Sequence, residues 1–170
     1  MNIRTEQPQD IDQITTITNA AFKGEGEAKL ISLIRESDYF IPELSLVTEE
    51  DGEVIGHILF SKIFIQTNAS KVSTLALAPM SVSPEKQRQG IGQQLVRAGL
   101  QTAKKLGCQH VFVLGHPEFY PKFGFTPSVE FSITPPFPVG PEYFMAIELQ
   151  RGSLSEVAGQ IVYSPPFSAL

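Results

Sequence analysis

The stretch Ser81–Gly92 reads S-V-S-P-E-K-Q-R-Q-G-I-G and lies between an apolar run and a segment with helical spacing. Glycines at the start of a helix let the backbone approach a ligand closely, because no Cβ stands in the way. The first N–H groups of a helix lack partners inside it, and the helix dipole adds partial positive charge there. Gln87–Gly92 therefore predicts a cradle for phosphate oxygens before a helix over Gln93–Leu106.

Two common phosphate-binding loops do not fit this stretch. A Walker loop needs Lys-Ser/Thr after its last glycine, whereas Gln93 and Gln94 follow Gly92. A Rossmann fingerprint needs three glycines at fixed offsets early in a βαβ unit, whereas two glycines stand here in mid-chain. The pattern Gln/Arg-x-x-Gly-x-Gly/Ala instead resembles the coenzyme A pyrophosphate loop of the GNAT N-acetyltransferase superfamily.

A second stretch carries the same resemblance. Val111–Gly115 has the pattern of a buried strand, and Pro117–Phe125 then reads P-E-F-Y-P-K-F-G-F. Tyr120 stands four residues before Gly124, which is similar to the superfamily's Tyr-x-x-x-Gly-Phe signature. The resemblance extends over Asn2–Leu149, and it looks closest to the small bacterial YhbS-like predicted acetyltransferases, which share G-H/D-P-x-Y/F-Y-x-x-F-G-F.

Length and composition indicate one globular domain. The chain has 170 residues, 42% of them hydrophobic and 18% charged, which suits one packed core and would be cramped for two. We expect an acetyltransferase domain over residues 1–149 and a C-terminal tail over residues 150–170 that packs on it. Cys108 is the only cysteine, so an internal disulfide is excluded.

The sequence also bears on location and partners. The first ten residues lack the apolar core of a signal peptide, and no apolar run approaches the ~18 residues that a membrane span needs. We therefore expect a cytoplasmic protein with no membrane partner. The net charge of −5 argues against nucleic acid, because phosphate backbones are bound by basic surfaces. The expected partner is a small-molecule amine or a protein amine, and a homodimer is compatible with these features.

Periodicity along the chain predicts a strand, two helices, three strands, a helix, a strand, a short helix and two strands. In this order, the ranges are Asn2–Glu6, Pro8–Ala21, Ala28–Ser37, Leu44–Thr48, Val54–Ile65, Thr74–Val82, Gln93–Leu106, Val111–Gly115, the short helix near Tyr120, Phe131–Ile133 and Phe144–Leu149. No regular element is predicted from Gln150 onward. The resemblance implies an α/β (α+β) fold of the GNAT type, in which a mixed, mostly antiparallel central sheet has helices on both faces.

The resemblance further implies acetyl-CoA as co-substrate, with no metal. Backbone N–H groups of the cradle would bind the pyrophosphate, namely those of Gln87, Arg88, Gln89, Gly90, Ile91 and Gly92. Arg88 or Lys86 would add a charge-assisted contact. The strand Pro79–Val82 would pair with the pantetheine arm, and the amide at Val82 would polarise the acetyl carbonyl. His116, directly after a strand end, would contact the cofactor.

Tyr120 is the expected general acid for the departing thiolate. Its reference pKa is about 10 and that of a thiol about 8.5, so unaided proton transfer is uphill by roughly 2 kcal/mol. Relatives often carry a second tyrosine just before this one, but Phe119 stands there, so the role would belong to Tyr120 alone. Attack by the amine on the thioester needs no protein nucleophile.

The general base stays open among several residues. His57 lies in I-G-H-I-L-F, and histidine suits proton transfer near neutral pH. Glu27, in the acidic F-K-G-E-G-E loop, stands where relatives often carry an acid that faces the acceptor pocket. Glu25, His116 and Glu118 are further candidates, and a water chain alone is the remaining alternative.

The predicted function is transfer of an acetyl group from acetyl-CoA to a primary amine by direct attack in a ternary complex. The alternative is a non-catalytic CoA-binding sensor or interaction module of the same fold, which would keep Gln87–Gly92 and tolerate loss of Tyr120. Polyamines, aminoglycosides, amino acids and protein N-termini all stay open as acceptors.

Overall fold

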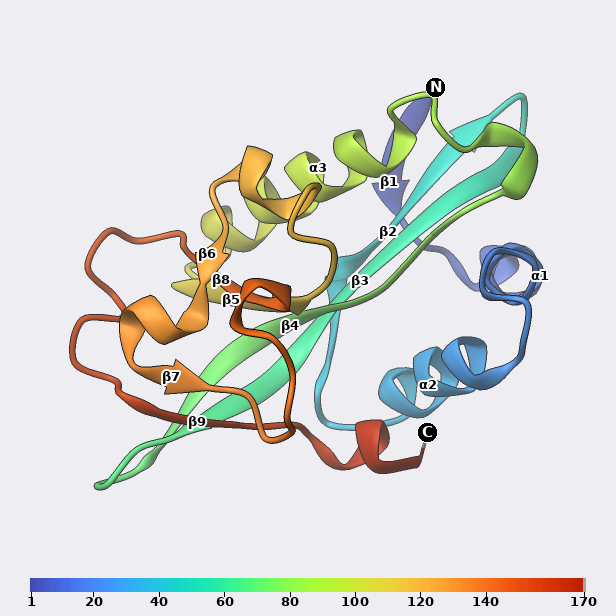
Figure 1. The fold of residues 1–170 in the computed structure, drawn as a ribbon. Coiled ribbons are helices and arrows are strands. Elements are labelled where there is room, and N and C mark those ends of the chain that lie inside the picture. The colour runs from blue at the N-terminus through green and yellow to red at the C-terminus, as the bar shows by residue number, and fades with distance from the viewer. Residues whose placement is uncertain (170) are drawn as a thin grey trace. The chain divides into compact units, whose positions relative to one another are not determined.

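The computed structural model describes residues 1–169 (Figure 1). Its α-helices are α1 (Ile11–Phe22), α2 (Gly26–Arg35) and α3 (Ile91–Lys105). The strands are β1 (Asn2–Thr5), β2 (Phe40–Glu50), β3 (Glu53–Gln66), β4 (Lys71–Val82), β5 (His110–Leu114), β6 (Thr126–Pro127), β7 (Ile133–Thr134), β8 (Phe144–Glu148) and β9 (Gly159–Val162). Short 3-10 turns connect them: η1 (Pro8–Asp10), η2 (Pro84–Lys86), η3 (Tyr120–Phe123), η4 (Ser128–Phe131), η5 (Pro141–Tyr143) and η6 (Pro165–Ala169).

The strands hydrogen-bond in the order β1-β2-β3-β4-β5-β8-β6, with β9 beside β3 and β7 beside β9. Antiparallel pairs are β1–β2, β2–β3, β3–β9, β5–β8 and β6–β8. The pairs β4–β5 and β7–β9 are parallel. The predicted mixed, mostly antiparallel sheet is therefore confirmed.

The chain forms two compact units. Among the described residues, unit 1 holds residues 1–61, 78–102 and 165–169. Unit 2 holds residues 62–77 and 103–164. Strands β3 and β4 and helix α3 contribute residues to both units.

In unit 1, helices cover both faces of β3. Successive residues of a strand point to opposite faces, so neighbouring residues of β3 contact different helices. Val47 and Leu59 pack with the apolar faces of α1 and α2. On the opposite face, a Cβ added to Gly56 would lie 3.1 Å from both Ile91 and Leu95 of α3. Farther along α3, Gly99 lies against the ring of Phe60, where an added Cβ would come within 2.1 Å. The glycines therefore let α3 approach the sheet closely.

In unit 2, β5 carries the core between its parallel neighbour β4 and its antiparallel neighbour β8. Phe112 of β5 stacks on Phe144 of β8 with ring centroids 6.0 Å apart. Strand β9 lies in the stretch after Gln150, where the sequence predicted no regular element. The strand is held by backbone pairing with β3. This pairing brings Gly159 so close to Gln66 that an added Cβ would lie 2.0 Å from the Gln66 carbonyl oxygen.

Most predicted helices and strands are confirmed, with ends that differ from the prediction by a few residues. The backbone conformation of the turns explains where the elements end. Asp51 and Gly52 both have positive φ, 53° and 80°, as the predicted hairpin turn requires. Helix α3 ends before Gly107, whose φ of 86° supplies the left-handed residue that terminates a helix. Phe131 belongs to η4 rather than to a strand, because Ser132 adopts φ 59° and its N–H bonds back to Val129.

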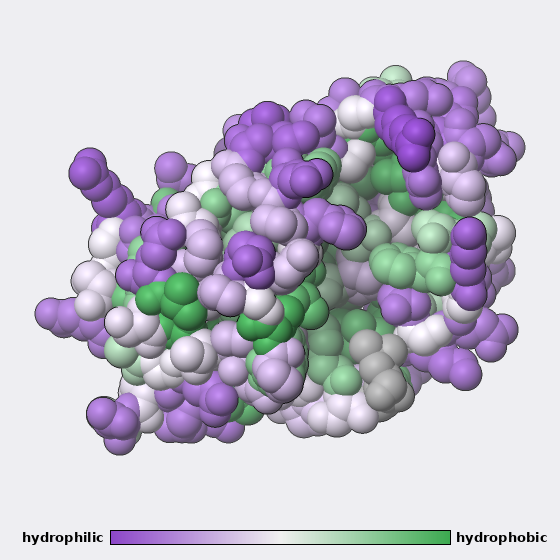
Figure 2. Space-filling model, viewed as in Figure 1, coloured by the Kyte–Doolittle hydropathy of each residue, from purple (hydrophilic) through white to green (hydrophobic). Residues whose placement is uncertain are grey.

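Figure 2 shows hydrophilic side chains over much of the viewed face, with apolar residues in separate groups. Large apolar residues that are exposed come from separate elements: Met1, Phe22, Leu33, Leu106, Leu114, Val129 and Tyr143. None of the helices in residues 1–169 is long and apolar enough to cross a membrane.

Candidate functional site

The cradle, residues Gln87–Gly92, belongs to unit 1 and leads into α3. Arg88 and Gly90 both have left-handed backbone, with φ of 65° and 85°. The first helical turn closes when the Gln94 N–H donates to the Gly90 carbonyl at 3.1 Å. A Cβ added to Gly90 would meet no atom within 4 Å, so the space beside the loop is open. Left-handed backbone at a non-glycine residue is costly and concentrates at functional sites.

One hydrogen bond attaches the cradle to Val82 at the end of β4, and two more hold Ser83, the residue after β4, in place. The Gln87 side-chain amide donates to the Val82 carbonyl at 3.1 Å, and the Ser83 N–H donates to the Ile55 carbonyl at 2.8 Å. The Ser83 hydroxyl donates to the Glu85 carboxylate at 3.0 Å. The predicted phosphate loop and the predicted carbonyl-polarising amide of Val82 are thus held together, and the Gln87 side chain is engaged with the protein itself.

Lys86 and Arg88 are the two cationic residues expected to contact the phosphates, and an ion pair distinguishes Lys86 from Arg88. Lys86 Nζ lies 2.8 Å from Glu50 Oε1. The Glu50 carboxylate raises the pKa of Lys86, and the Lys86 ammonium lowers the pKa of Glu50. Arg88 is exposed on the same loop. Because Lys86 is paired with the β2–β3 hairpin, Arg88 is the better placed of the two to contact a phosphate.

Helix α1 lies against the end of β4. The Thr18 and Ser81 hydroxyl oxygens are 3.1 Å apart, and both side chains are buried. Helix α1 ends at Phe22, the next residue Lys23 has φ 55°, and the acidic loop then leads into α2. Glu27 is half-buried in the first turn of α2. Glu25 is exposed, and its Oε2 atom lies 4.0 Å from Lys29 Nζ.

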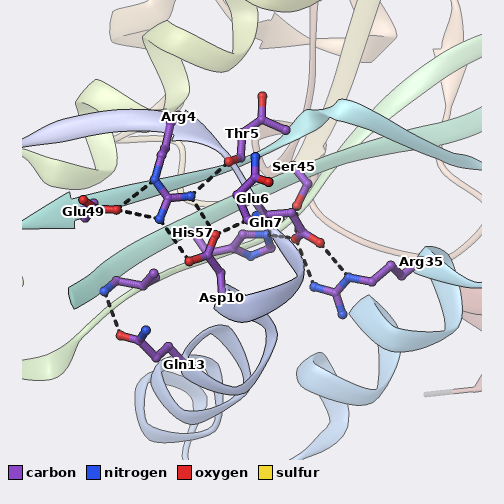
Figure 3. Close-up of polar contacts among 11 residues, drawn as sticks. Arg4, Thr5, Glu6, Gln7, Asp10, Gln13, Arg35, Ser45, Glu49 and His57 are labelled. Atoms are coloured by element: carbon purple, nitrogen blue, oxygen red, sulfur yellow. Dashed lines mark hydrogen bonds and ion pairs between the residues drawn. The ribbon is translucent and has the colours of Figure 1, made fainter. Parts of the chain in front are cut away.

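His57, one of the candidate general bases from the sequence, is fully buried beneath α1 and α2, so its side chain does not face solvent. Its Nε2 lies 2.8 Å from the Ser45 hydroxyl and 3.5 Å from Glu6 Oε1 (Figure 3). Burial lowers the pKa of His57, and the nearby Glu6 carboxylate only partly offsets this. Direct contact between His57 and an acceptor amine would require this cluster to open.

The network around Glu6 and His57 was not predicted from the sequence. Arg35 donates to the Glu6 carboxylate through Nε at 2.8 Å and Nη2 at 3.0 Å, and the Ser45 hydroxyl also donates to it. Burial alone would raise the pKa of Glu6, but hydrogen bonds from His57, Arg35 and Ser45 outweigh it and lower this pKa to about 2. The partners come from separate elements, so no local sequence signal identifies them.

In unit 2, Tyr120 is packed over Gly115 at the end of β5. A Cβ added to Gly115 would lie 2.3 Å from the ring atom Cε2 of Tyr120. The rings of Phe119 and Phe125 contact the same tyrosine edge to face, at 5.0 and 5.7 Å between centroids. The side chain is 9% exposed, and burial raises the pKa of Tyr120 to about 12. The phenol therefore stays protonated well above neutral pH.

His116 is exposed and begins the turn that orients Tyr120. Its carbonyl accepts hydrogen bonds from the N–H groups of Phe119 and Tyr120, at 3.1 and 3.4 Å. Glu118 is exposed in the same turn. Unit 2 thus brings together His116 and Tyr120.

Unit 1 brings together the cradle and Val82, and it also contains Glu27 and His57. Among residues 1–169, no three His, Cys, Asp or Glu side chains are grouped as a metal site would require.

Comparison with known proteins identifies the family. The model of the acetyltransferase (GNAT) family matches residues 11–125. The chain is 36% identical over 135 residues to the uncharacterized N-acetyltransferase YjhQ of Escherichia coli K12, covering 79% of this chain and 75% of that protein. It is 30% identical over 168 residues to YhbS, an uncharacterized N-acetyltransferase of the same strain, covering 99% of each chain.

Solved structures agree with this. The crystal structure of Escherichia coli YhbS in complex with CoA has a TM-score of 0.89 at 29% identity and covers 98% of this chain and 91% of its own. A GNAT family acetyltransferase of Brucella melitensis, crystallised with acetyl-CoA, has a TM-score of 0.80 at 31% identity. The match covers 98% of this chain and 97% of the Brucella chain. The chain belongs to the GNAT family of N-acetyltransferases, and both the predicted family and the predicted fold type are confirmed.

Proposed function

We propose that this protein transfers an acetyl group from acetyl-CoA to a primary amine, by direct attack of the amine in a ternary complex. The observation that carries the proposal is the cradle, in which left-handed Arg88 and Gly90 lead into the N-terminus of α3 with open space beside Gly90. Two similar GNAT proteins were crystallised with CoA and with acetyl-CoA. We expect the pyrophosphate of acetyl-CoA to bind the cradle in this chain as well.

Within the cradle, the backbone N–H groups of Gln87, Arg88, Gln89, Gly90, Ile91 and Gly92 would bind the phosphate oxygens, assisted by the Arg88 guanidinium. The Val82 amide would polarise the acetyl carbonyl, because it lies at the β4 end that Gln87 holds to the loop. One preorganised donor of this kind contributes roughly 3 kcal/mol to stabilisation of the transition state.

Tyr120 would protonate the departing thiolate. The raised pKa of Tyr120, about 12, keeps the phenol protonated throughout the pH range of an ordinary assay. The same burial raises the pKa of a thiol that leaves in these apolar surroundings, because low polarity disfavours both anions. His116, exposed at the start of the same turn, would contact the cofactor.

On the acceptor side, we propose that Glu27 attracts the ammonium form of the amine. Glu27 is half-buried at the start of α2, so its charge is less screened than that of exposed Glu25. Glu27→Gln should raise the KM for the amine about tenfold and leave the KM for acetyl-CoA unchanged. Glu25→Gln in the same loop is the matched control and should change neither. Equal effects of both variants would contradict a specific role for Glu27.

The decisive test is thiol release from acetyl-CoA with panels of polyamines, aminoglycosides, amino acids and peptides with free N-termini. Turnover with one of these classes supports the proposal and identifies the acceptor. If CoA raises the melting temperature but no amine is acetylated, the protein is a CoA-binding sensor or interaction module instead. Failure of CoA to stabilise the protein would contradict both functions.

A further inference from the structure

Unit 1 contains a buried polar row on the sheet face that α1 and α2 cover (Figure 3 shows its Glu6 end). Its members are Glu6, Ser45, His57 and Ser81, and each of their side chains is at most 9% exposed. Such a row is costly in an apolar core unless its groups are hydrogen-bonded. The positions of the protons in these bonds therefore determine which polar atoms stay without a partner.

The carboxylate of Glu6 determines the tautomer of His57. The pKa of Glu6 is about 2, so at neutral pH this carboxylate is ionised and only accepts hydrogen bonds. The Ser45 hydroxyl donates its proton to Glu6, so Ser45 can only accept from His57. The Nε2 atom of His57 therefore carries the proton, and neutral His57 has a free lone pair on Nδ1. Within residues 1–169, Nδ1 is buried without a hydrogen-bond partner.

The other end of the row reaches the end of β4. The bond from the Ser83 N–H to the Ile55 carbonyl aligns β4 with β3, which places Ser81 opposite His57 two residues farther along. Side chains that lie opposite each other on neighbouring strands share a face. The contact between Ser81 and Thr18 of α1 confirms that Ser81 faces the helices. Ser81 directly precedes Val82, whose amide we assign to the acetyl carbonyl.

We propose that His57 Nδ1 is the internal acceptor for the proton that the amine loses on attack, with Glu6 and Ser45 as its positioning residues. This rests on the proposed function. One N–H bond of the attacking nitrogen breaks, and the Thr18 and Ser81 hydroxyls, 3.1 Å apart, relay one proton. The Ser81 hydroxyl must turn toward the unpartnered Nδ1 to deliver that proton, and an Nδ1–H bond then forms. The resulting imidazolium is stabilised through Nε2–H and Ser45 by the Glu6 carboxylate. His57 releases the proton by the same route after product leaves.

The charged surroundings of His57 suit this cycle. Glu6 and Arg35 are the charged groups that act on the ring, with opposite effects on its pKa. Asp10 of η1 and Glu49 of β2 share the single positive charge of Arg4, at 2.7 and 2.6 Å, which leaves this trio with a net charge of −1. Burial lowers the pKa of His57, so the ring is neutral and ready to accept a proton near pH 7.

The test is the pH dependence of kcat, measured as thiol release with an amine that the wild-type protein accepts. His57→Gln should lower kcat about 100-fold and remove the acidic limb, with the KM for acetyl-CoA unchanged. Glu6→Gln should move the acidic limb to lower pH, because the imidazolium loses its counter-charge. Ser81→Ala leaves His57 and Glu6 in place and should lower kcat about tenfold without altering the melting-temperature shift that CoA causes.

His110 provides the matched control. It is also a buried histidine on a strand, with Nδ1 2.6 Å from the Thr74 hydroxyl, but it belongs to unit 2. His110→Gln should leave the acidic limb in place. An unchanged limb in folded His57→Gln or Glu6→Gln overturns the proposal while the proposed function stands. Lack of turnover by the wild-type protein with every amine overturns the proposed function and the proton acceptor with it.

A second measurement needs no acceptor amine. Nitrogen-15 NMR of the imidazole ring reports which nitrogen carries the proton. We expect neutral His57 to be protonated on Nε2, with a pKa below the ordinary histidine value, and we expect Glu6→Gln to lower that pKa further. A proton on Nδ1 of neutral His57 overturns the proposal.

Discussion

Gly90 and Gly107 flank α3 and offer a matched pair of substitutions that isolates the phosphate site. Their φ angles are 85° and 86°, and a Cβ added to either would meet no atom within 4 Å. Alanine at each position therefore carries the same backbone strain, roughly 1–2 kcal/mol, and no steric clash. For a chain of this length, that strain lowers the melting temperature by about 2–8 °C. Without ligand, the two alanine variants should be equally destabilised.

Coenzyme A should separate the two variants. At a concentration of about 100 Kd, a ligand that binds only the folded state stabilises it by about 2.7 kcal/mol, which raises the melting temperature by about 5–10 °C. Gly107→Ala should keep this increase, because Gly107 lies beyond the C-terminal end of α3. Gly90→Ala should lose most of it, because its methyl group occupies the open side of the loop. Gly90→Glu should abolish it, because the carboxylate repels phosphate.

Thermal unfolding with and without CoA, followed by circular dichroism, measures both effects. Equal CoA-induced shifts in Gly90→Ala and Gly107→Ala would refute the reasoning. They would show that the space beside Gly90 is not used by the cofactor, and the cradle would then be a turn that serves only to start α3.

Three further predictions concern single side chains. Tyr120→Phe should lower kcat about 100-fold with little change in acetyl-CoA affinity, and any basic limb below pH 10 should persist, because the pKa of Tyr120 is about 12. If this variant has the same kcat as the wild-type protein, Tyr120 serves only in packing. Gly115→Ala should displace the Tyr120 ring and destabilise the fold by roughly 1–3 kcal/mol in urea unfolding; an unaltered free energy of unfolding would contradict the observed contact. The lowered pKa of Glu6, about 2 against 4.5, should contribute about 3 kcal/mol of stability that is present above pH 4.5 and lost as the pH falls toward 2. Glu6→Gln should remove this dependence from the pH profile of unfolding, and an identical profile would refute it.

Several features were predictable from the sequence because they depend on neighbours along the chain. The cradle of Gln87–Gly92 requires a glycine with positive φ before a helix, and Gly90 provides it. The turn after β5 was marked by the spacing from Tyr120 to Gly124, and Gly124 indeed adopts φ 106°. The hairpin at Asp51 and Gly52 follows the same logic, since few residues tolerate left-handed backbone.

The environment of His57 was not predictable in this way. The apolar neighbours of His57 in I-G-H-I-L-F indicated a buried strand, but they did not indicate that Glu6, Ser45 and Arg35 would gather around the ring. Counted along the chain from His57, Ser45 is 12 residues away, Arg35 is 22 and Glu6 is 51. Their proximity results from the pairing of β2 with β3 and from the packing of α2.

The sequence by itself thus determined the family, the order of most elements and the two landmark turns, because local backbone conformation and hydrophobic period are written in adjacent residues. The tertiary structure decided which charges meet. It paired Lys86 with Glu50 and so distinguished it from Arg88, and it buried His57 against Glu6. It also made a strand of Gly159–Val162, which has no apolar period of its own. The reason is the same in each case: pairing energies depend on distance in space, and the chain brings distant residues together only when the sheet has formed.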